Sequence, residues 1–281
     1  MIEIHRSFVN TWECDENRHM NVRFYLRRFE EGAAVFLAMR ANGGKRPALR
    51  HRHVRYHREL LEAESTVTLA AFPQDGPLKG HLVQVLREIS TGRICATSLD
   101  RFEGLETEAI EADDEATEAV SPRGLAAGDC EADDPAILTG YMETGAALAI
   151  SYIVVTQDDL DAEGRPRTDR IVGCFSDGAS HIWEHAGITT EWLNAHNNGR
   201  VSVEMKVQPV STASPGEVLQ LVSRVGDHRG RTFRLVHTLR SLDDGRAVAR
   251  GEVCCLVMNL ESRRAVPLPE SFAAYMIGHS L

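Results

Sequence analysis

The sequence predicts an α+β fold in two similar halves, each a long helix followed by an antiparallel sheet that wraps it. The main observation is an internal repeat at an offset of 146 residues, which places residues 29–33 on residues 175–179. The apolar stripe of the first helix follows the same offset. Its positions Tyr25, Leu26, Phe29, Ala33, Phe36 and Leu37 fall on Ile171, Val172, Phe175, Ala179, Ile182 and Trp183. So many matched apolar positions indicate a duplicated unit.

Strand-like runs continue the repeat beyond the helix. The offset there is 153 residues, so that the turn at 91–93 falls on the turn at 244–246. Runs typical of strands lie at 5–13, 65–71, 81–88, 93–102, 147–156 and 201–207. The two helices are predicted at 21–41, ended by Gly43 and Gly44, and at 168–186, closed by Gly187.

The length of the chain agrees with two domains. A chain of 281 residues is long for one compact domain and suits two of roughly 125 residues each. Residues 103–134 carry twelve acidic side chains and one basic one, which is typical of an exposed, mobile linker. We therefore expect a first domain at 1–103, an acidic linker at 104–144 and a second domain at 145–281.

One stretch before the first helix concentrates chemically able side chains. Asp15, Asn17, His19 and Asn21 step by two, so in an extended segment they share one face. A carboxylate near an imidazole can polarise a water molecule or attack a carbonyl carbon directly. The first N–H groups of the helix would then face a developing oxyanion. The alternative is structural: Asp15 and Asn17 cap the helix, and His19 is a turn histidine.

This stretch resembles the hotdog-fold thioesterases, in particular the acyl-ACP thioesterases and their acyl-CoA relatives. The resemblance rests on D-x-N-x-H-x-N with a tyrosine six residues after the histidine and a glutamate twelve after it, here Asp15, Asn17, His19, Asn21, Tyr25 and Glu31. It implies a tandem double hotdog fold, catalytic roles for Asp15, Asn17 and His19, and substrate-side positions for the other three. Val22 and Arg28 depart from the family pattern. These departures bear on acyl preference more than on the chemistry.

A basic segment follows the first helix. Residues 45–58 hold six Lys or Arg and three His in a chain whose net charge is −10. Two interpretations stay open. Either the segment is a solvated loop, or Arg50, Arg52 and Arg55 form a platform for the phosphates of CoA or for an acidic carrier protein.

The second half has lost most of the motif. At the 146 offset, Asp15, Asn17, His19 and Asn21 fall on Asp161, Glu163, Arg165 and Arg167. We expect an inactive or binding-only second site, since no imidazole is available there. Arg165 is a candidate for holding a phosphate or a substrate carboxylate, or else a surface arginine. Glu31 persists as Asp177, and both are either substrate-side acids or plain surface.

Composition excludes several classes of protein. The net charge of −10 argues against a nucleic-acid partner, and no apolar run approaches the length of a membrane span. The six cysteines show no C-x-x-C spacing, which favours reduced thiols in the cytoplasm over a disulfide frame or a zinc site. Cys14 is either a packed thiol or a nucleophile. No metal or redox cofactor is implied.

The predicted function is hydrolysis of an acyl thioester of CoA or of an acyl carrier protein. Asp15 would act as general base or nucleophile, His19 would assist and Asn17 would position, while backbone N–H groups near 21–23 polarise the carbonyl. Two alternatives are carried: a hotdog enoyl-thioester hydratase, and a non-catalytic acyl-thioester binding protein. The resemblance implies that the two hotdog units pair within one chain, and we expect that such pseudo-dimeric chains can form a homo-oligomer.

Overall fold

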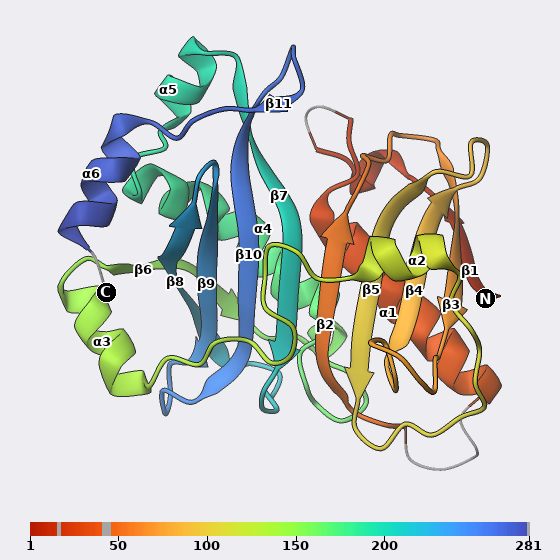
Figure 1. The fold of residues 1–281 in the computed structure, drawn as a ribbon. Helices are drawn as coiled ribbons and strands as arrows, with labels where there is room; N and C mark the ends of the chain where they lie inside the picture. The colour runs from red at the N-terminus through yellow and green to blue at the C-terminus, as the bar shows by residue number, and fades with distance from the viewer. Residues whose placement is uncertain (16–17, 41–45, 280–281) are drawn as a thin grey trace. The chain divides into compact units, whose positions relative to one another are not determined.

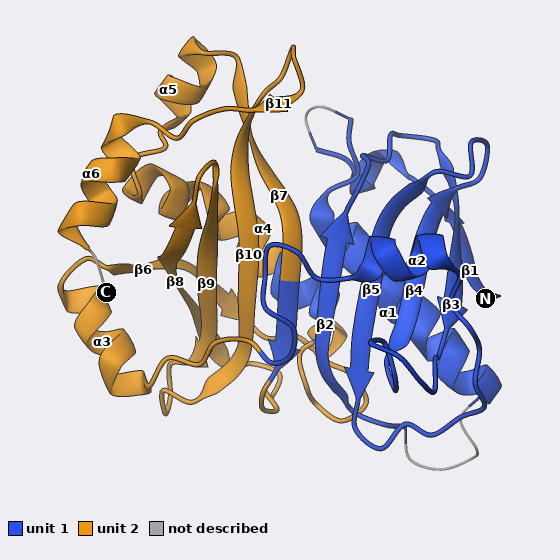
Figure 2. Ribbon diagram, in the orientation of Figure 1, with its two compact units in different colours: residues 1–129, 167–172, 206–209 blue, residues 130–166, 173–205, 210–281 orange. Residues whose placement is uncertain are grey.

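The structure is a computed structural model of the 281-residue chain and describes residues 1–15, 18–40 and 46–279. The chain forms two compact units (Figures 1 and 2). The first contains residues 1–129, 167–172 and 206–209, and the second contains residues 130–166, 173–205 and 210–281.

The first unit places a long helix on an antiparallel sheet. Its elements are β1 (Ile2–Phe8), the 3-10 helix η1 (Thr11–Glu13), α1 (Val22–Arg40), β2 (Leu49–Tyr56), β3 (Ser65–Ala71), β4 (Leu82–Glu88), β5 (Ile94–Phe102) and α2 (Asp114–Val120). The strand order is β1-β3-β4-β5-β2, and neighbouring strands are antiparallel. Phe36 and Leu37 of α1 pack with Ile4, Ala70 and Leu82 of the sheet. The apolar stripe predicted from the sequence is therefore the core of this unit.

The second half of the chain repeats this plan. Its elements are α3 (Pro135–Glu143), β6 (Ala147–Val154), η2 (Gln157–Asp159), α4 (Thr168–His185), α5 (Thr190–Ala195), β7 (Asn198–Pro209), β8 (Val218–Arg229), β9 (Thr232–Ser241), β10 (Ala247–Asn259), β11 (Arg264–Ala265) and α6 (Glu270–Gly278). The strand order is β7-β10-β9-β8-β6, and β11 pairs with β10. The predicted α+β fold with two similar halves is confirmed.

Both long helices touch the first strand of their sheet through a glycine. A Cβ atom on Gly32 would lie 3.0 Å from Cδ1 of Ile4, and one on Gly178 would lie 2.9 Å from Cδ1 of Ile150. These distances are shorter than ordinary carbon contacts. Both pairs obey the 146 offset, so the matched glycines reflect one packing solution used twice.

The acidic segment differs from the predicted linker. Residues 104–129 belong to the first compact unit, because Ala116 and Val120 of α2 are fully buried against Val83, Val85 and Leu99 of its sheet. Two small apolar residues four positions apart give the helix one apolar face within an acidic run. The first strand also ends earlier than expected, at Phe8, since Asn10 and Glu13 form a capping box around η1.

The core of the second unit contains a histidine where the first has a glutamine. At the 153 offset His237 matches Gln84, and its ring stacks on Phe175 with 4.3 Å between centroids. Burial lowers the pKa of His237 to about 3. Its folded pKa thus lies below that of the unfolded chain, so the stability is fully present above pH ~6.5 and is lost as pH falls, because only the unfolded chain takes up the proton.

We therefore expect His237→Gln to flatten the pH dependence of stability. Between pH 7 and pH 5 the variant should lose about 2 kcal/mol less unfolding free energy than the wild type, from a slope of about 1.4 kcal/mol per pH unit for one proton. Urea unfolding at the two pH values measures this difference. The exposed His228, changed to glutamine, is the control and should follow the wild type. A wild-type pH dependence in His237→Gln would contradict the assignment.

Candidate functional site

The predicted motif forms a turn between η1 and α1. The main-chain N–H of Asp15 donates to the His19 carbonyl oxygen at 2.9 Å, and the His19 N–H donates to Asp15 Oδ1 at 3.0 Å. Arg18 closes the turn with a left-handed backbone at φ 62°, a conformation that costs a side chain roughly 1–2 kcal/mol. The spacing predicted an extended segment for this motif, and the structure shows a turn instead. This turn brings Asp15 and His19 together.

A neighbouring segment holds this turn in place. The Met20 N–H donates to the Leu60 carbonyl at 2.8 Å, and the Arg18 guanidinium donates to the Glu62 carboxylate. The Leu60 N–H donates to the hydroxyl oxygen of Tyr25 at 2.9 Å. Tyr25 is 4% exposed, so it anchors the segment from inside the core. Tyr25 was expected to contact the substrate, and the structure instead gives it a structural position.

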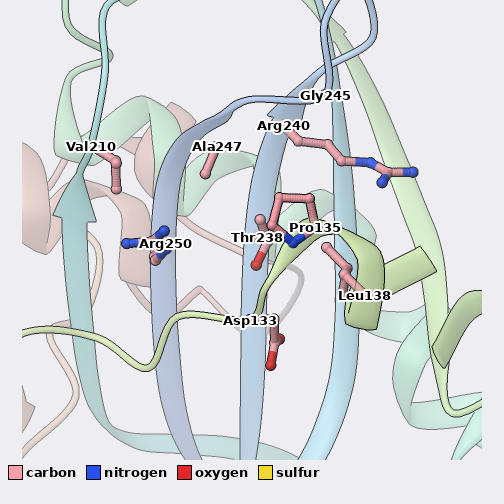
Figure 3. A pocket seen from close by; sticks show the side chains of 9 residues that line it. All are labelled: Asp133, Pro135, Leu138, Val210, Thr238, Arg240, Gly245, Ala247 and Arg250. Carbon is pink, nitrogen blue, oxygen red and sulfur yellow. The ribbon is translucent and has the colours of Figure 1, made fainter. Parts of the chain in front are cut away.

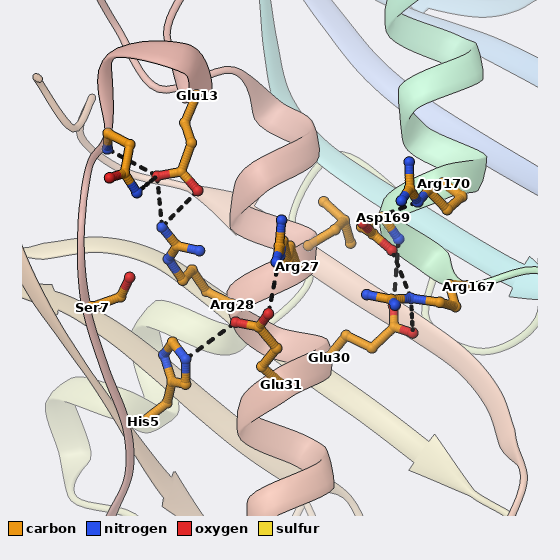
Figure 4. Close-up of polar contacts among 12 residues, drawn as sticks. His5, Ser7, Glu13, Arg27, Arg28, Glu30, Glu31, Arg167, Asp169 and Arg170 are labelled. Atoms are coloured by element: carbon orange, nitrogen blue, oxygen red, sulfur yellow. Dashed lines mark hydrogen bonds and ion pairs between the residues drawn. The ribbon is translucent and has the colours of Figure 1, made fainter. Parts of the chain in front are cut away.

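A buried ion pair lies beneath the turn (Figure 4). Arg28 Nη2 donates to both carboxylate oxygens of Glu13, at 2.8 and 2.7 Å. The Glu13 carbonyl oxygen accepts the N–H of Asn21 at 2.9 Å, which ties the pair to the end of the motif. The second half has Asp159 and Cys174 at the matching positions. The Arg28–Glu13 pair therefore supports only the turn that contains a histidine.

The imidazole of His19 has a carboxylate neighbour that the sequence did not indicate. Its Nδ1 lies 3.6 Å from Glu59 Oε1, and the two side chains are 29% and 41% exposed. Glu59 is separated from the motif by the whole of α1, and no pattern links them. Asn17, the third expected catalytic residue, lies outside the described residues.

Asn21 caps α1. Its Oδ1 accepts the N–H of Arg23 at 3.0 Å, and its carbonyl oxygen accepts the N–H of Phe24 at 2.9 Å. This is the capping arrangement of an asparagine before the first helical residue. The N–H groups of Asn21 and Arg23 already donate within the protein, so these two are not expected oxyanion donors, whereas a role for the Val22 N–H stays a prediction. Asn21 shapes the turn that presents Asp15.

Cys14 next to the motif is a weak candidate for a nucleophile. Burial raises the pKa of its thiol, and the carboxylates of Glu62, Asp15 and Glu13 raise it further. A thiol needs a lowered pKa to supply thiolate at neutral pH. The packed-thiol interpretation of Cys14 is the one that the geometry favours.

Glu31 is held by an imidazole and a guanidinium of the same unit (Figure 4). Its Oε2 lies 3.2 Å from Nε2 of His5, and its Oε1 accepts from Arg27 Nε at 2.9 Å. The hydrogen bond with His5, with help from Arg27, lowers the pKa of Glu31 to about 2. Its counterpart Asp177 is exposed, and Ser151 and Gly173 stand where His5 and Arg27 would be. The two helix acids therefore have different surroundings.

The second half folds the same turn without the imidazole. The Asp161 N–H donates to the Arg165 carbonyl at 2.8 Å, and the Arg165 N–H donates to Asp161 Oδ1 at 2.8 Å. Gly164 closes this turn at φ 79°, as Arg18 closes the first. The Arg165 guanidinium lies 3.1 Å from Asp161 Oδ2. The Asp-to-Arg ion pair here replaces the Asp and His of the first turn.

The basic segment is a strand of the sheet. Arg52 is 1% exposed, and its Nε and Nη2 donate to the two carboxylate oxygens of the fully buried Asp100 at 2.9 and 2.7 Å. Arg55, also buried, donates to the carbonyl oxygens of Ala119 and Ser121 at 2.6 and 3.0 Å. The phosphate platform is therefore corrected for Arg52 and Arg55. Arg50 is half exposed and pairs with Asp129.

A polar relay continues from Arg52 to the first turn of α4. Arg52 Nη1 donates to the Thr168 hydroxyl at 2.7 Å, and that hydroxyl donates to Glu30 Oε2 at 2.8 Å. Burial raises the pKa of Glu30, while Arg167 lies 3.4 Å from its other oxygen (Figure 4). Sequence reasoning missed Glu30, because it is adjacent to Glu31 and carries no separate pattern.

Comparison with known proteins identifies a family and a fold. The model of the thioesterase-like superfamily matches residues 9–117 and 155–276, so it covers both halves and most of the chain. No curated protein matches the sequence. Among the residues that the structure describes, no helix has the length and apolar character needed to cross a membrane.

Solved structures share the fold over nearly the whole chain. An acyl-ACP thioesterase from Bacteroides thetaiotaomicron aligns with a TM-score of 0.57 at 10% identity, covering 89% of this chain and 96% of its own. The 12:0-ACP thioesterase from Umbellularia californica aligns with a TM-score of 0.54 at 13% identity, covering 93% and 94%. The tesB protein of Mycobacterium avium subsp. paratuberculosis aligns with 0.54 at 10%, covering 90% and 92%. The predicted tandem hotdog fold is confirmed.

Proposed function

Because this chain belongs to the thioesterase-like superfamily, we propose that it hydrolyses an acyl thioester to a free acid and a thiol. The observation that carries the proposal is the first turn, where Asp15 and His19 are joined by two hydrogen bonds. One runs from the Asp15 N–H to the His19 carbonyl oxygen at 2.9 Å, and the other runs from the His19 N–H to the Asp15 carboxylate at 3.0 Å. Acyl-CoA is the first substrate class that we would test, and an acyl carrier protein thioester is the second.

The proposed step assigns one proton acceptor. The oxygen of a water molecule bonds to the thioester carbonyl carbon while its proton passes to the Asp15 carboxylate. The carbon–sulfur bond then breaks, and the leaving thiolate takes up the proton held by Asp15, which gives the thiol and restores the Asp15 carboxylate. His19 assists this transfer. The nearby Glu59 carboxylate favours the tautomer of the imidazole in which Nδ1 carries the proton. In the alternative mechanism, the Asp15 carboxylate attacks the carbonyl carbon and displaces the thiolate, which forms an anhydride between Asp15 and the acyl group. Water then hydrolyses this anhydride and releases the acid.

A panel of acyl-CoA thioesters tests the proposal. Release of free thiol should accompany loss of substrate, and saturated and unsaturated acyl groups should both be cleaved. The enoyl absorbance is followed in the same samples. Loss of that absorbance without thiol release would identify a hydratase, and saturable binding with neither change would identify a non-catalytic binding protein. Repeating the assay with acyl-ACP decides between the two carriers.

The difference between the two turns predicts one working site per chain. His19→Ala should lower kcat by about 100-fold or more, as expected for loss of an acid–base group, whereas Arg165→Ala should change at most KM. Steady-state kinetics of both variants measure this, and each replaces the same position of a matched turn. Titration with a non-hydrolysable acyl-CoA analogue should give one productive site per chain. Two equivalent sites, or an equal loss of kcat in Arg165→Ala, would contradict the assignment.

A further inference from the structure

The second unit contains a cavity that the proposed reaction does not use. Its volume is about 200 Å³, and it lies between the sheet and α3 (Figure 3). The residues that line it are Asp133, Pro135, Leu138, Val210, Thr238, Arg240, Gly245, Ala247 and Arg250. All of them belong to the second compact unit, and none belongs to either motif turn.

Two cross-strand pairs of β9 and β10 contribute to the wall of this cavity. Arg250 is directly opposite Thr238, and Ala247 is directly opposite Arg240. Directly opposed residues of an antiparallel pair project from the same face of the sheet. Pro135 and Leu138 of α3 line the cavity as well. The site therefore combines apolar side chains with a hydroxyl and guanidinium groups.

In the first unit, the matching face of the sheet is packed against α2. At the 153 offset, Thr238 and Arg250 match Val85 and Thr97, which are also directly opposite each other. Val85 packs in a core cluster with Ala116 and Val120 of α2, and the Thr97 hydroxyl donates to the Ala119 carbonyl at 3.2 Å. At this face the second unit thus has a threonine in place of the apolar Val85 and an arginine in place of Thr97.

Ala247 marks the second difference between the two faces. Its counterpart in the first unit is Ile94, which packs against the α2 cluster. Replacing an isoleucine by an alanine removes three carbon atoms from a packed face and leaves volume behind. The shorter side chain of Ala247 therefore leaves space at this face of the second unit.

The charges at the cavity favour an anion. Among the described residues, neither Arg240 nor Arg250 forms an ion pair with a carboxylate. Arg240 donates to the neutral Gln220 Oε1 at 2.9 and 2.7 Å, and Arg250 Nε is buried without a hydrogen-bond partner. The one lining carboxylate, Asp133, is neutralised by Arg224 through bonds of 3.0 and 2.8 Å. An unpaired buried donor is costly, so a bound anion would stabilise this site.

We propose that this cavity binds a small organic carboxylate with an apolar body. A cavity of about 150 Å³ lined by hydrocarbon holds benzene, so this one suits a molecule close in size to benzoate. The carboxylate would pair with the Arg250 guanidinium, with the Thr238 hydroxyl beside it, and the apolar body would contact Pro135, Leu138 and Ala247. The proposal is independent of the reaction at Asp15.

Benzoate is the probe, and the whole chain is the protein tested. Titration calorimetry or ligand-observed NMR should show saturable benzoate binding, with benzyl alcohol and inorganic phosphate at least about tenfold weaker, since each lacks one half of the recognition. Arg250→Met keeps an apolar stem and should weaken benzoate by about tenfold or more. Ala247→Ile restores the residue of the first unit and should abolish binding by filling the cavity.

Arg229→Met is the matched control, because Arg229 is an exposed arginine of the same unit, and it should bind benzoate as the wild type does. Should Ala247→Ile not fold, Arg250→Met alone decides the question. Wild-type affinity in Arg250→Met would overturn the proposal, as would equal binding of benzyl alcohol, tighter binding of phosphate, or no saturable binding below about 10 mM.

Discussion

Replacing Asp15 by asparagine should lower the rate of thioester hydrolysis by roughly a thousandfold, because the amide cannot accept the proton of the attacking water. The fold of the turn should survive. The asparagine Oδ1 can still accept the His19 N–H, which Asp15 Oδ1 accepts at 3.0 Å, and the other anchors of the turn are unchanged. The loss should therefore appear in kcat, with the unfolding midpoint close to that of the wild type. Thiol release under saturating substrate measures the rate.

The repeat supplies the control for this experiment. Asp161→Asn makes the same change in a turn with the same hydrogen bonds, since Asp161 Oδ1 accepts the Arg165 N–H at 2.8 Å. We expect it to keep wild-type turnover. Near-wild-type turnover in a folded Asp15→Asn protein would remove Asp15 from the chemistry, and an equal loss in both variants would point to a structural role for the turn.

Replacing Arg52 by leucine should destabilise the first unit by about 3–5 kcal/mol, the cost of leaving a buried charge without its partner. The uncompensated charge is Asp100, which is fully buried and also accepts from Gln84 at 2.8 Å. Urea unfolding monitored by circular dichroism measures the change. Adding Asp100→Asn to Arg52→Leu should recover part of the loss, because the neutral amide removes the buried charge.

Arg50→Leu is the control for this prediction. Arg50 is in the same strand, but its side chain is 54% exposed, and exposed ion pairs contribute about 0–1 kcal/mol. The stability of this variant should stay near that of the wild type. A folded Arg52→Leu protein with unchanged stability and a raised KM would instead restore the substrate-phosphate interpretation.

The sequence by itself determined the architecture and the position of the proposed site. The apolar stripe of α1, its copy in α4 and the matched Gly32 and Gly178 define two helix-on-sheet units, because helical periodicity and its repetition can be read from the sequence alone. The 146 offset also located the second turn and its missing imidazole. Both turns have the same pair of hydrogen bonds, one between main-chain groups and one from a main-chain N–H to the aspartate side chain, so the sequence repeat matched Asp15 with Asp161 correctly.

Only the tertiary structure decided which polar residues are structural. Arg52 and Asp100 are 48 residues apart, and a run of arginines has the same local pattern on a surface as in a buried strand. Tyr25 likewise has a distant partner, because its hydroxyl accepts the N–H of Leu60, 35 residues further along the chain. Glu30 and Glu59 could be identified only from the structure, because their contacts are with residues distant in the sequence.

The cavity of the second unit, too, could be found only from the tertiary structure. Thr238, Ala247 and Arg250 are ordinary strand residues in the sequence, and they matter only because cross-strand pairing places them together beneath α3. Periodicity reports which face of an element is apolar, since it depends on neighbours along the chain. Partners for a buried charge, and the space left by a smaller side chain, depend on neighbours across the sheet, and these are set by packing.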